Sequence, residues 1–414
     1  MGLKIPMTRF PRPGFIRIGV AALLPALFIA QPVRADDEDT LNLSAGIAVL
    51  HDDNLFRLSP GVDPNTVLGK STKSDDITTA TVGLKLNKRY SLQQFELDAS
   101  LVDYRYRTFS YLDFTAANYA AAWRWSLTPY LHGNLTSDRK ESLNSFSDYS
   151  GYRTRNLRTD ENKRFDAVLE VSGSWRVLGG IARSTRINSQ LFLEEGDTRL
   201  DTAEGGLRYD FPSGTKLSYI ARDGRGDYFN RDQPIVATRL DNQFDQRENE
   251  VRLIWPVTEK TTIDARAAHI ERTHEHFGDR DYAGNVGALN VSWQVTDKTS
   301  VMAGFGRELS SYQSTDSSYI STDRFTLSPA WQISAKTTLR GRYDYAQRDY
   351  RGAIAATPLS DRVDTQHTAM IAFEWQALRA LSLSASLQND KRTSNQSGHD
   401  YKDTQAGVSA QLAF

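Results

Sequence analysis

The strongest constraint on the fold is an alternation of apolar and polar residues that continues through long stretches of the chain. Val251, Leu253 and Trp255 alternate with Glu250 and Arg252, and later stretches repeat this pattern. Alternation with a period of two puts the apolar side chains on one face of a β-strand and the polar side chains on the other. The sequence therefore predicts strands with one apolar and one polar face.

A short pattern, Trp-x-(Val or Ile)-x-x-Lys-Thr, recurs where these strands are expected to turn. It begins at Trp255, Trp293 and Trp331, and a looser copy begins at Trp375. A repeat of about 40 residues also occurs in solenoids and propellers, and a propeller blade needs four short strands in such a length. Here each repeat holds two strands of about 10 to 14 residues, enough to cross a bilayer. The repeat therefore favours a transmembrane barrel over a propeller.

The whole pattern predicts an all-β fold, a transmembrane antiparallel up-and-down β-barrel of about 18 strands, with 16 as the alternative count. The expected strands are 41–50, 76–88, 93–107, 114–127, 130–139, 163–176, 181–195, 199–211, 215–227, 243–256, 261–273, 281–295, 299–312, 320–333, 337–350, 361–376, 380–393 and 400–414. One short turn is expected at Gly179-Gly180, and short turns alternate with long polar connections such as 51–75 and 140–162. Short turns face the periplasm in such barrels, and an even strand count puts both chain ends there.

The last expected strand ends the chain on an aromatic residue. Val408, Ala410, Leu412 and Phe414 alternate with polar or small residues. A final strand with an aromatic carboxy-terminal residue resembles the assembly signal of bacterial outer-membrane barrels. The barrel is expected to occupy residues 36–414.

Residues 1–35 have the features of a secretory signal peptide. Four basic residues precede an apolar run over 18–30, and Val33-Arg34-Ala35 forms a small-residue cleavage site. A membrane anchor is the alternative, but a spanning helix needs roughly 20 apolar residues. We therefore expect export, cleavage after about Ala35 and a bacterial outer-membrane location.

Composition narrows the possible functions. Residues 1–35 hold five of the 50 basic residues and none of the 51 acidic ones, so the mature chain has a net charge near −6. That balance argues against a nucleic-acid partner. Cysteine is absent, and the mean hydropathy of −0.52 is compatible with a barrel, in which only alternate strand residues meet lipid.

The sequence carries no recognisable catalytic signature. The only histidine cluster is His274-Glu275-His276, and a His-x-His pair without a third ligand is a weak metal signal. No nucleophile elbow, zinc-protease motif, phosphate loop or dinucleotide fingerprint occurs. We expect no enzyme activity, no metal and no cofactor.

Charged residues of both signs are expected on the inward face of the strands. They can select solutes as fixed charges, or pair across strands and fill the wall; the second alternative is favoured, and neither sign dominates. The candidate pore residues are Arg208, Arg252, Arg266, Arg340 and Arg342. Tyrosines expected near the inward charges would suit a hydroxyl-rich chain, although tyrosine is also the ordinary girdle residue; these are Tyr104, Tyr106, Tyr343 and Tyr345.

One segment after the first strand, Asp52-Asp53-Asn54-Leu55-Phe56-Arg57-Leu58, precedes a loop that contains proline and glycine. Together with the leader, the length, the repeated turns and the terminal Phe414, it resembles the EpsL-type proteins. These are outer-membrane barrels of exopolysaccharide biosynthesis operons, often found beside an exosortase system. The resemblance spans the chain, but its one compact motif is this segment, and other barrel families open similarly.

The resemblance implies polysaccharide export, or support for export, and supplies no catalytic residues. Since no periplasmic helical-repeat domain is evident, a periplasmic export protein would be a separate partner. Within the segment, Asp52, Asp53 and Arg57 are expected at an outer rim or in a constriction, with Phe56 plugging or lining it. The alternative is a turn ordered by Asn54.

Three functions stay open at this point. The first is an outer-membrane channel, surrounded by outer-membrane lipid, that takes part in exopolysaccharide export or biosynthesis. The second is a general diffusion porin, and the third is a non-conducting structural or surface-interaction barrel. The substrate, the openness of the lumen and the oligomeric state do not follow from the sequence.

Overall fold

The computed structural model describes residues 40–149, 153–190, 196–354 and 360–414, which form one closed antiparallel barrel of 18 strands. The expected signal peptide lies outside the described residues. The strands are β1 (Leu41–Asp52), β2 (Asp75–Tyr90), β3 (Gln93–Tyr106), β4 (Phe114–Thr128), β5 (Leu131–Leu143), β6 (Leu157–Ser172), β7 (Trp175–Asn188), β8 (Thr198–Asp210), β9 (Lys216–Tyr228), β10 (Gln243–Thr258), β11 (Thr261–His274), β12 (Tyr282–Thr296), β13 (Thr299–Ser311), β14 (Tyr319–Ser334), β15 (Thr337–Arg351), β16 (Val363–Gln376), β17 (Leu381–Ser394) and β18 (Tyr401–Ala413). The helical turns are α1 (Pro64–Leu68), η1 (Ser110–Leu112), η2 (Val236–Thr238) and η3 (Gly278–Arg280).

Pairing of the first and last strands closes the barrel. β1 pairs with β2 on one side and with β18 on the other, and Val49 lies opposite Val408. Beyond the last ladder residues, the backbone N–H of Phe414 donates to the carbonyl of Leu43 at 2.8 Å. Closure leaves no sheet edge, which is the condition for a β-structure to span hydrocarbon.

The count of 18 strands is confirmed, and one expected turn is wrong. The β6–β7 turn lies at Gly173-Ser174, where Gly173 has a φ of +48°. Gly180 instead lies inside β7, where a side chain would meet the carbonyl oxygen of Phe165 at 2.9 Å. Glycine is needed here for close packing, so the glycine pair signals crowding and not a turn.

The recurring tryptophan pattern encodes a bulged hairpin. In its first copy, the pairing register shifts between Pro256 and Thr258, just before the short turn. The hydroxyl of Thr258 accepts a hydrogen bond from the N–H of Lys260 at 3.2 Å. The copies at residues 293 and 331 show the same register shift and the same hydroxyl-to-backbone bond. The Thr or Ser at the fourth position of the pattern therefore orders each turn.

The outer surface carries an apolar band with tryptophans near the short turns. Trp255, Trp293, Trp331 and Trp375 are all exposed on this surface, as expected for an aromatic girdle. Towards the long loops the outward side chains become charged: Phe305 is followed on its face by Arg307. No helix among the described residues is long and apolar enough to cross a membrane.

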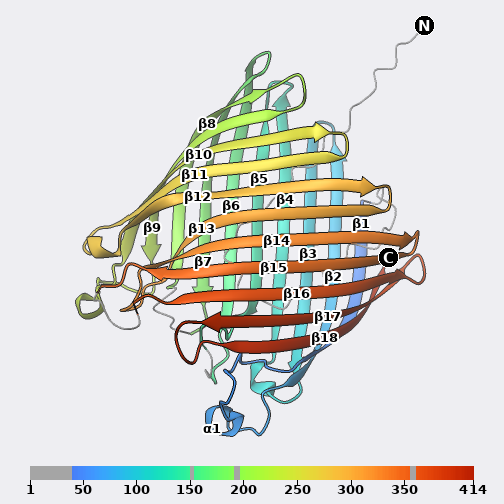
Figure 1. The fold of residues 1–414 in the computed structure, drawn as a ribbon. Helices are drawn as coiled ribbons and strands as arrows, with labels where there is room; N and C mark the ends of the chain where they lie inside the picture. Colours follow the sequence, from blue (N-terminus) through green and yellow to red (C-terminus); the bar gives the residue numbers. More distant parts are fainter. Residues whose placement is uncertain (1–39, 150–152, 191–195, 355–359) are drawn as a thin grey trace.

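The two rims of the barrel differ. Short turns and the C-terminus lie at one rim, while α1 and the longer connections lie at the other (Figure 1). This asymmetry matches short periplasmic turns and long extracellular loops. We call the long-loop rim the mouth.

The apolar band predicts a penalty for an outward charge near its middle. Ile371 points outward on β16 beside Leu387 of β17, and half of its surface is exposed. Ile371→Arg should lower the free energy of unfolding in lipid vesicles by about 2–4 kcal/mol. Urea titration would measure this, with Ile371→Leu as the control, and an equal stability of both variants would contradict a lipid-facing band.

Candidate functional site

The segment from Asp52 to Leu58 turns into the mouth directly after β1. The Asp52 carboxylate accepts the N–H of Asn54 at 2.9 Å. The Asn54 amide group donates to the carbonyls of Leu58 and Lys402, both at 2.9 Å, and its oxygen accepts the N–H of Leu58 at 2.9 Å. Asp53 stays exposed and accepts the N–H of Thr404. These bonds fix the turn to β18, so the segment is both an ordered turn and an inward projection.

Arg57 connects this turn to the wall. Its backbone has a φ of +55°, and its guanidinium group lies 3.1 Å from a carboxylate oxygen of Asp52 and 3.1 Å from one of Asp403. Burial would lower the pKa of Arg57, but the two carboxylates hold this pKa above its usual value. Arg57 is therefore a permanent cation that holds two buried carboxyl groups, one from the turn and one from β18.

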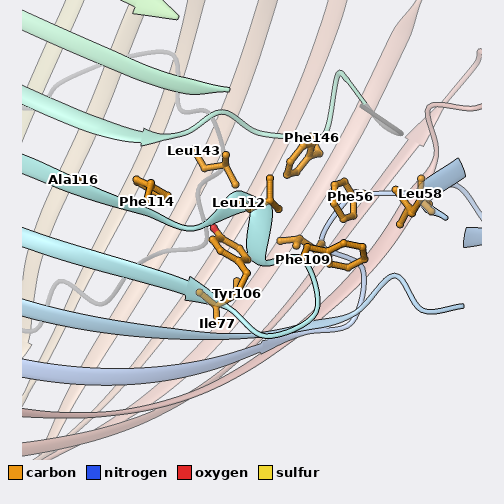
Figure 2. Packing of buried hydrophobic residues seen from close by; sticks show 12 residues of the cluster. Phe56, Leu58, Ile77, Tyr106, Phe109, Leu112, Phe114, Ala116, Leu143 and Phe146 are labelled. Carbon is orange, nitrogen blue, oxygen red and sulfur yellow. The ribbon is translucent and has the colours of Figure 1, made fainter. Parts of the chain in front are cut away.

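Phe56 lies at the centre of an aromatic cluster inside the mouth (Figure 2). It is fully buried, with its ring centroid 4.7 Å from that of Phe109 and 4.6 Å from that of Phe146. These residues come from three connections, after β1, β3 and β5. Aromatic pairs in such edge and tilted geometries stabilise a core, so the three connections pack as one body.

Asp148, in the connection after β5, reaches across the mouth to the wall formed by β15–β17. Its carboxylate lies 3.1 Å from Arg348, 3.4 Å from Arg362 and 2.9 Å from Arg392. The hydroxyl of Tyr350 donates to it at 3.3 Å. We call Asp148, Tyr350 and the three arginines the Asp148 clamp. It anchors the β5–β6 connection to strands far away in the sequence.

The clamp controls the charge of Asp148. Burial would raise the pKa of this carboxyl group, but the guanidinium groups of Arg348, Arg392 and Arg362 hold the pKa well below its usual range. The carboxylate therefore stays ionised throughout the physiological pH range. Removing it would leave the buried Arg348 without this carboxylate and Arg362 and Arg392 with Asp364 alone, which is costly.

A cavity of about 80 Å³ lies beneath the aromatic cluster. Tyr104, Tyr106 and Phe114 line it on one side, and Gln388 and Gln405 on the other. Ligand sites usually measure several hundred Å³, roughly 300 or more. This cavity is too small for a sugar chain unless the connections above it move.

A row of charges, which we call the lumen ladder, follows the inner wall from β6 to β11. Its members are Arg164, Glu204, Arg222, Glu248, Glu250 and Arg266. The register sets Glu204 opposite Arg222, and Arg222 opposite Glu248. Arg222 lies 2.9 Å from Glu204, 2.6 Å from Glu248 and 2.7 Å from Glu250. Arg222 is thus shared between carboxylates on β8 and β10, Arg266 contacts both carboxylates of β10, and Arg164 contacts Glu204 across β7.

All five arginines proposed from the sequence as pore residues point inward, and each has a carboxylate partner. The nitrogen-to-oxygen distances are 2.8 Å for Arg208–Asp210, 2.6 Å for Arg252–Asp264, 2.6 Å for Arg266–Glu250, 3.0 Å for Arg340–Glu374 and 2.5 Å for Arg342–Asp344. The inward charges are therefore paired with one another, as the favoured alternative of the sequence analysis expected. Because both signs alternate, the wall offers donors and acceptors without a large excess of either.

The expected tyrosines divide between the two faces. Tyr104 and Tyr106 point inward and line the cavity. Tyr343 and Tyr345 do not face the lumen, because they share the outward face of β15 with Leu339, which lies opposite the exposed Trp331. Their expected place beside the inward charges is therefore wrong.

Among the described residues, one carboxylate group has metal-ligand spacing. Oxygens of Asp52, Asp53 and Asp403 lie within 4.8 Å of one another. Arg57 already bridges Asp52 and Asp403, so its guanidinium group lies where a metal ion would have to bind. The two histidines of the sequence cluster face different carboxylates: His274 contacts Asp281 and His276 contacts Asp241.

The connections of β9–β14 form a second cluster at the mouth. Arg280, in η3, is buried and donates to the carbonyls of Thr238, Ser314 and Ser317. Asp241 accepts the N–H of His276. Burial lowers the pKa of Arg280 to about 10, which still leaves it charged at neutral pH.

Comparisons with known proteins agree with this architecture. Residues 280–414 match the family described as "Putative beta-barrel porin 2". OccK2 (OpdF) of Pseudomonas aeruginosa superposes with a TM-score of 0.50 at 11% identity, over 90% of this chain and 97% of that one. The outer membrane protein OpdK of the same organism gives 0.50 at 12% identity, over 90% and 99%. No curated protein sequence matches.

These findings define a class. The closed barrel of 18 strands, its apolar outer band and its charged inner wall make the protein a porin-like β-barrel of the outer membrane. At 11–12% identity, the solved structures establish the fold. The family match covers the last third of the chain, from η3 to the C-terminus.

The Asp148 clamp predicts a specific acid response. A carboxyl group whose pKa is lowered by folding stabilises the folded state fully above its unfolded pKa of 3.8, and this stabilisation is lost as the pH falls further. The difference in free energy of unfolding between wild type and Asp148→Asn should be constant from pH 7 to about pH 4.5 and shrink in stronger acid. A difference that already declines near pH 6 would show that another group controls the clamp.

Proposed function

We propose that the protein is a diffusion channel for small hydrophilic solutes across the outer membrane. The observation that carries this proposal is the solvent exposure of charged side chains on the inner wall. Inward arginines remain partly exposed although they point into the barrel: Arg252 by 36% and Arg340 by 33% of their side-chain surface. A lumen filled by side chains would bury these charges, whereas barrels of 16–18 strands leave an aqueous channel.

The mouth clusters would set the size limit. The body of connections around Phe56 and Asp148 covers the β1–β5 and β15–β18 side of the mouth. Solutes would pass along the β6–β11 wall, where the lumen ladder offers both hydrogen-bond donors and acceptors. Paired charges of this kind suit neutral and zwitterionic solutes better than strong selection of one sign.

Channel recordings test this proposal. Single-channel conductance in planar bilayers should be measurable for the wild type and higher for Asp148→Ala, because the β5–β6 connection would be released from the far wall. Arg351→Ala, an exposed residue whose partner is Asp349, serves as the control and should match the wild type. Folded protein that conducts in neither form would favour the non-conducting structural barrel.

The ladder predicts the ion selectivity. Wild type should show a permeability ratio for K⁺ over Cl⁻ near unity, and Arg222→Gln should become cation-selective because three carboxylates lose a shared cation. The reversal potential in a KCl gradient measures this. Arg307→Gln, on the outer face, removes the same charge outside the lumen and should leave the reversal potential unchanged.

Polysaccharide export is a second candidate. It rests on the segment that resembles EpsL-type proteins, which lies in the mouth with Asn54 and Phe56 fully buried. A polymer would need the clamp to open, because the cavity beneath holds only about 80 Å³. Deleting the gene separates the two candidates: polymer trapped in the periplasm supports export, and unchanged surface polymer with reduced sugar uptake supports the diffusion channel.

A further inference from the structure

The outer surface of β5–β9 contains a groove of about 600 Å³, separate from the lumen. Its lower part is apolar, with the exposed side chains of Leu135, Phe165 and Ile181. Its upper part is charged, with Lys163 and Arg225 among the lining residues. The groove thus lies across the border where the outer face changes from an apolar band to a charged collar.

The register explains how this border is built. Lys163 of β6 lies opposite Arg183 of β7, Arg183 opposite Asp201 of β8, and Asp201 opposite Arg225 of β9. These four outward side chains therefore form one row across four neighbouring strands. Three interstrand steps of roughly 4.8 Å each separate the row's ends by about 14 Å.

The row below is apolar over β5–β8 and reaches the small Ala203, beyond which Asp223 of β9 lines the groove and pairs with Arg247 at 3.3 Å. Leu135 lies opposite Phe165, Phe165 opposite Ile181, and Ile181 opposite Ala203. Ala203 is exposed and its methyl group leaves the surface hollow beside the larger Ile181. The hollow is continuous with the charged row directly above it.

The charges in the row differ in how firmly they are held. Arg183 is saturated by Asp201, with two hydrogen bonds of 2.5 and 2.9 Å. Lys163 lies 3.7 Å from Glu161 and is 58% exposed; Arg225 lies 3.5 Å from Asp245 and is 76% exposed. Both loose pairs are weak, since exposed pairs contribute little. The groove therefore offers two loosely held cations, Lys163 and Arg225, with a neutralised pair between them, and the carboxylate of Asp223 at its β9 side is paired with Arg247.

We infer that this groove binds a phosphorylated, multi-acylated glycolipid of the outer leaflet. The inference depends on the membrane position of the barrel and not on conduction through it. A soluble anion would contact only the charged row, and an uncharged acyl chain only the apolar row. A ligand that matches both rows needs an anionic headgroup directly above hydrocarbon chains, and the mouth side of the barrel places this border in the outer leaflet.

Bisphosphorylated lipid A is the probe for this site, measured by native mass spectrometry on the full mature barrel in detergent. The wild type should bind one molecule with preference over lipid A lacking its phosphates. The double variant Lys163→Ala/Arg225→Ala should lose about thirtyfold in affinity, the effect expected of two surface cations. Ala203→Trp keeps every charge and should lower the affinity by filling the hollow.

Arg307→Ala is the matched control, because Arg307 belongs to the same collar but lies on β13, outside the groove. Resistance to denaturation in unheated gel samples verifies that each variant is folded. The inference is overturned if Arg307→Ala weakens binding as much as the double variant, or if neither the double variant nor Ala203→Trp changes it. It is also overturned if free glucosamine 1-phosphate competes as well as lipid A, since the site would then serve a soluble anion.

Discussion

Closure of the hydrogen-bonded ladder between β1 and β18 is the constraint on which the rest of this structure depends. Nine consecutive pairs, from Ser44–Ala413 to Asp52–Gln405, join the two ends of the sheet. In hydrocarbon each backbone group without a hydrogen-bond partner costs several kcal/mol, so an open sheet edge would be strongly destabilising. Once the sheet is closed, each strand side chain has two possible destinations, the lipid or the lumen. Within each strand, residues at every second position therefore face the lipid, and the residues between them face the lumen.

That sorting explains why much of the fold could be predicted from the sequence. Alternation identified the strands, and it placed Arg252 and Arg340 on the inward face, where the structure has them. Tyr343 was misplaced because aromatic residues are acceptable on both faces, although its position between the inward Arg342 and Asp344 already puts it on the outward face, in agreement with its pairing with Leu327. Gly180 was taken for a turn, yet its missing side chain makes room for the Glu204 carboxylate, which would lie 2.9 Å from a β-carbon there. The lumen ladder needs that room.

The mouth could not be predicted, because its contacts are not periodic. Asp148 meets Arg348 and Arg392, which lie 200 and 244 positions away in the chain. A long connection at 140–162 was expected from the sequence, but the sequence did not indicate which of its residues would anchor it. The segment around Phe56 was found through its sequence, whereas Phe109 and Phe146, which complete its cluster, carry no distinguishing signal. Only the curvature of the barrel brings these residues together.

The two anchors of the mouth differ in physical character, and this difference bears on how it can open. The Phe56 cluster holds its connections by apolar burial, which is non-directional and tolerates small displacements. The Asp148 clamp depends on guanidinium groups that must meet one carboxylate in defined geometry. If that carboxylate withdraws, Arg362 and Arg392 still share the carboxylate of Asp364, at 2.5 and 3.7 Å, so the cost of withdrawal falls mainly on the buried Arg348. Release of the Asp148 clamp would free this part of the β5–β6 connection from the β15–β17 wall, while Phe146 of the same connection would still pack against Phe56, so the polar anchor is the one that a local displacement can break.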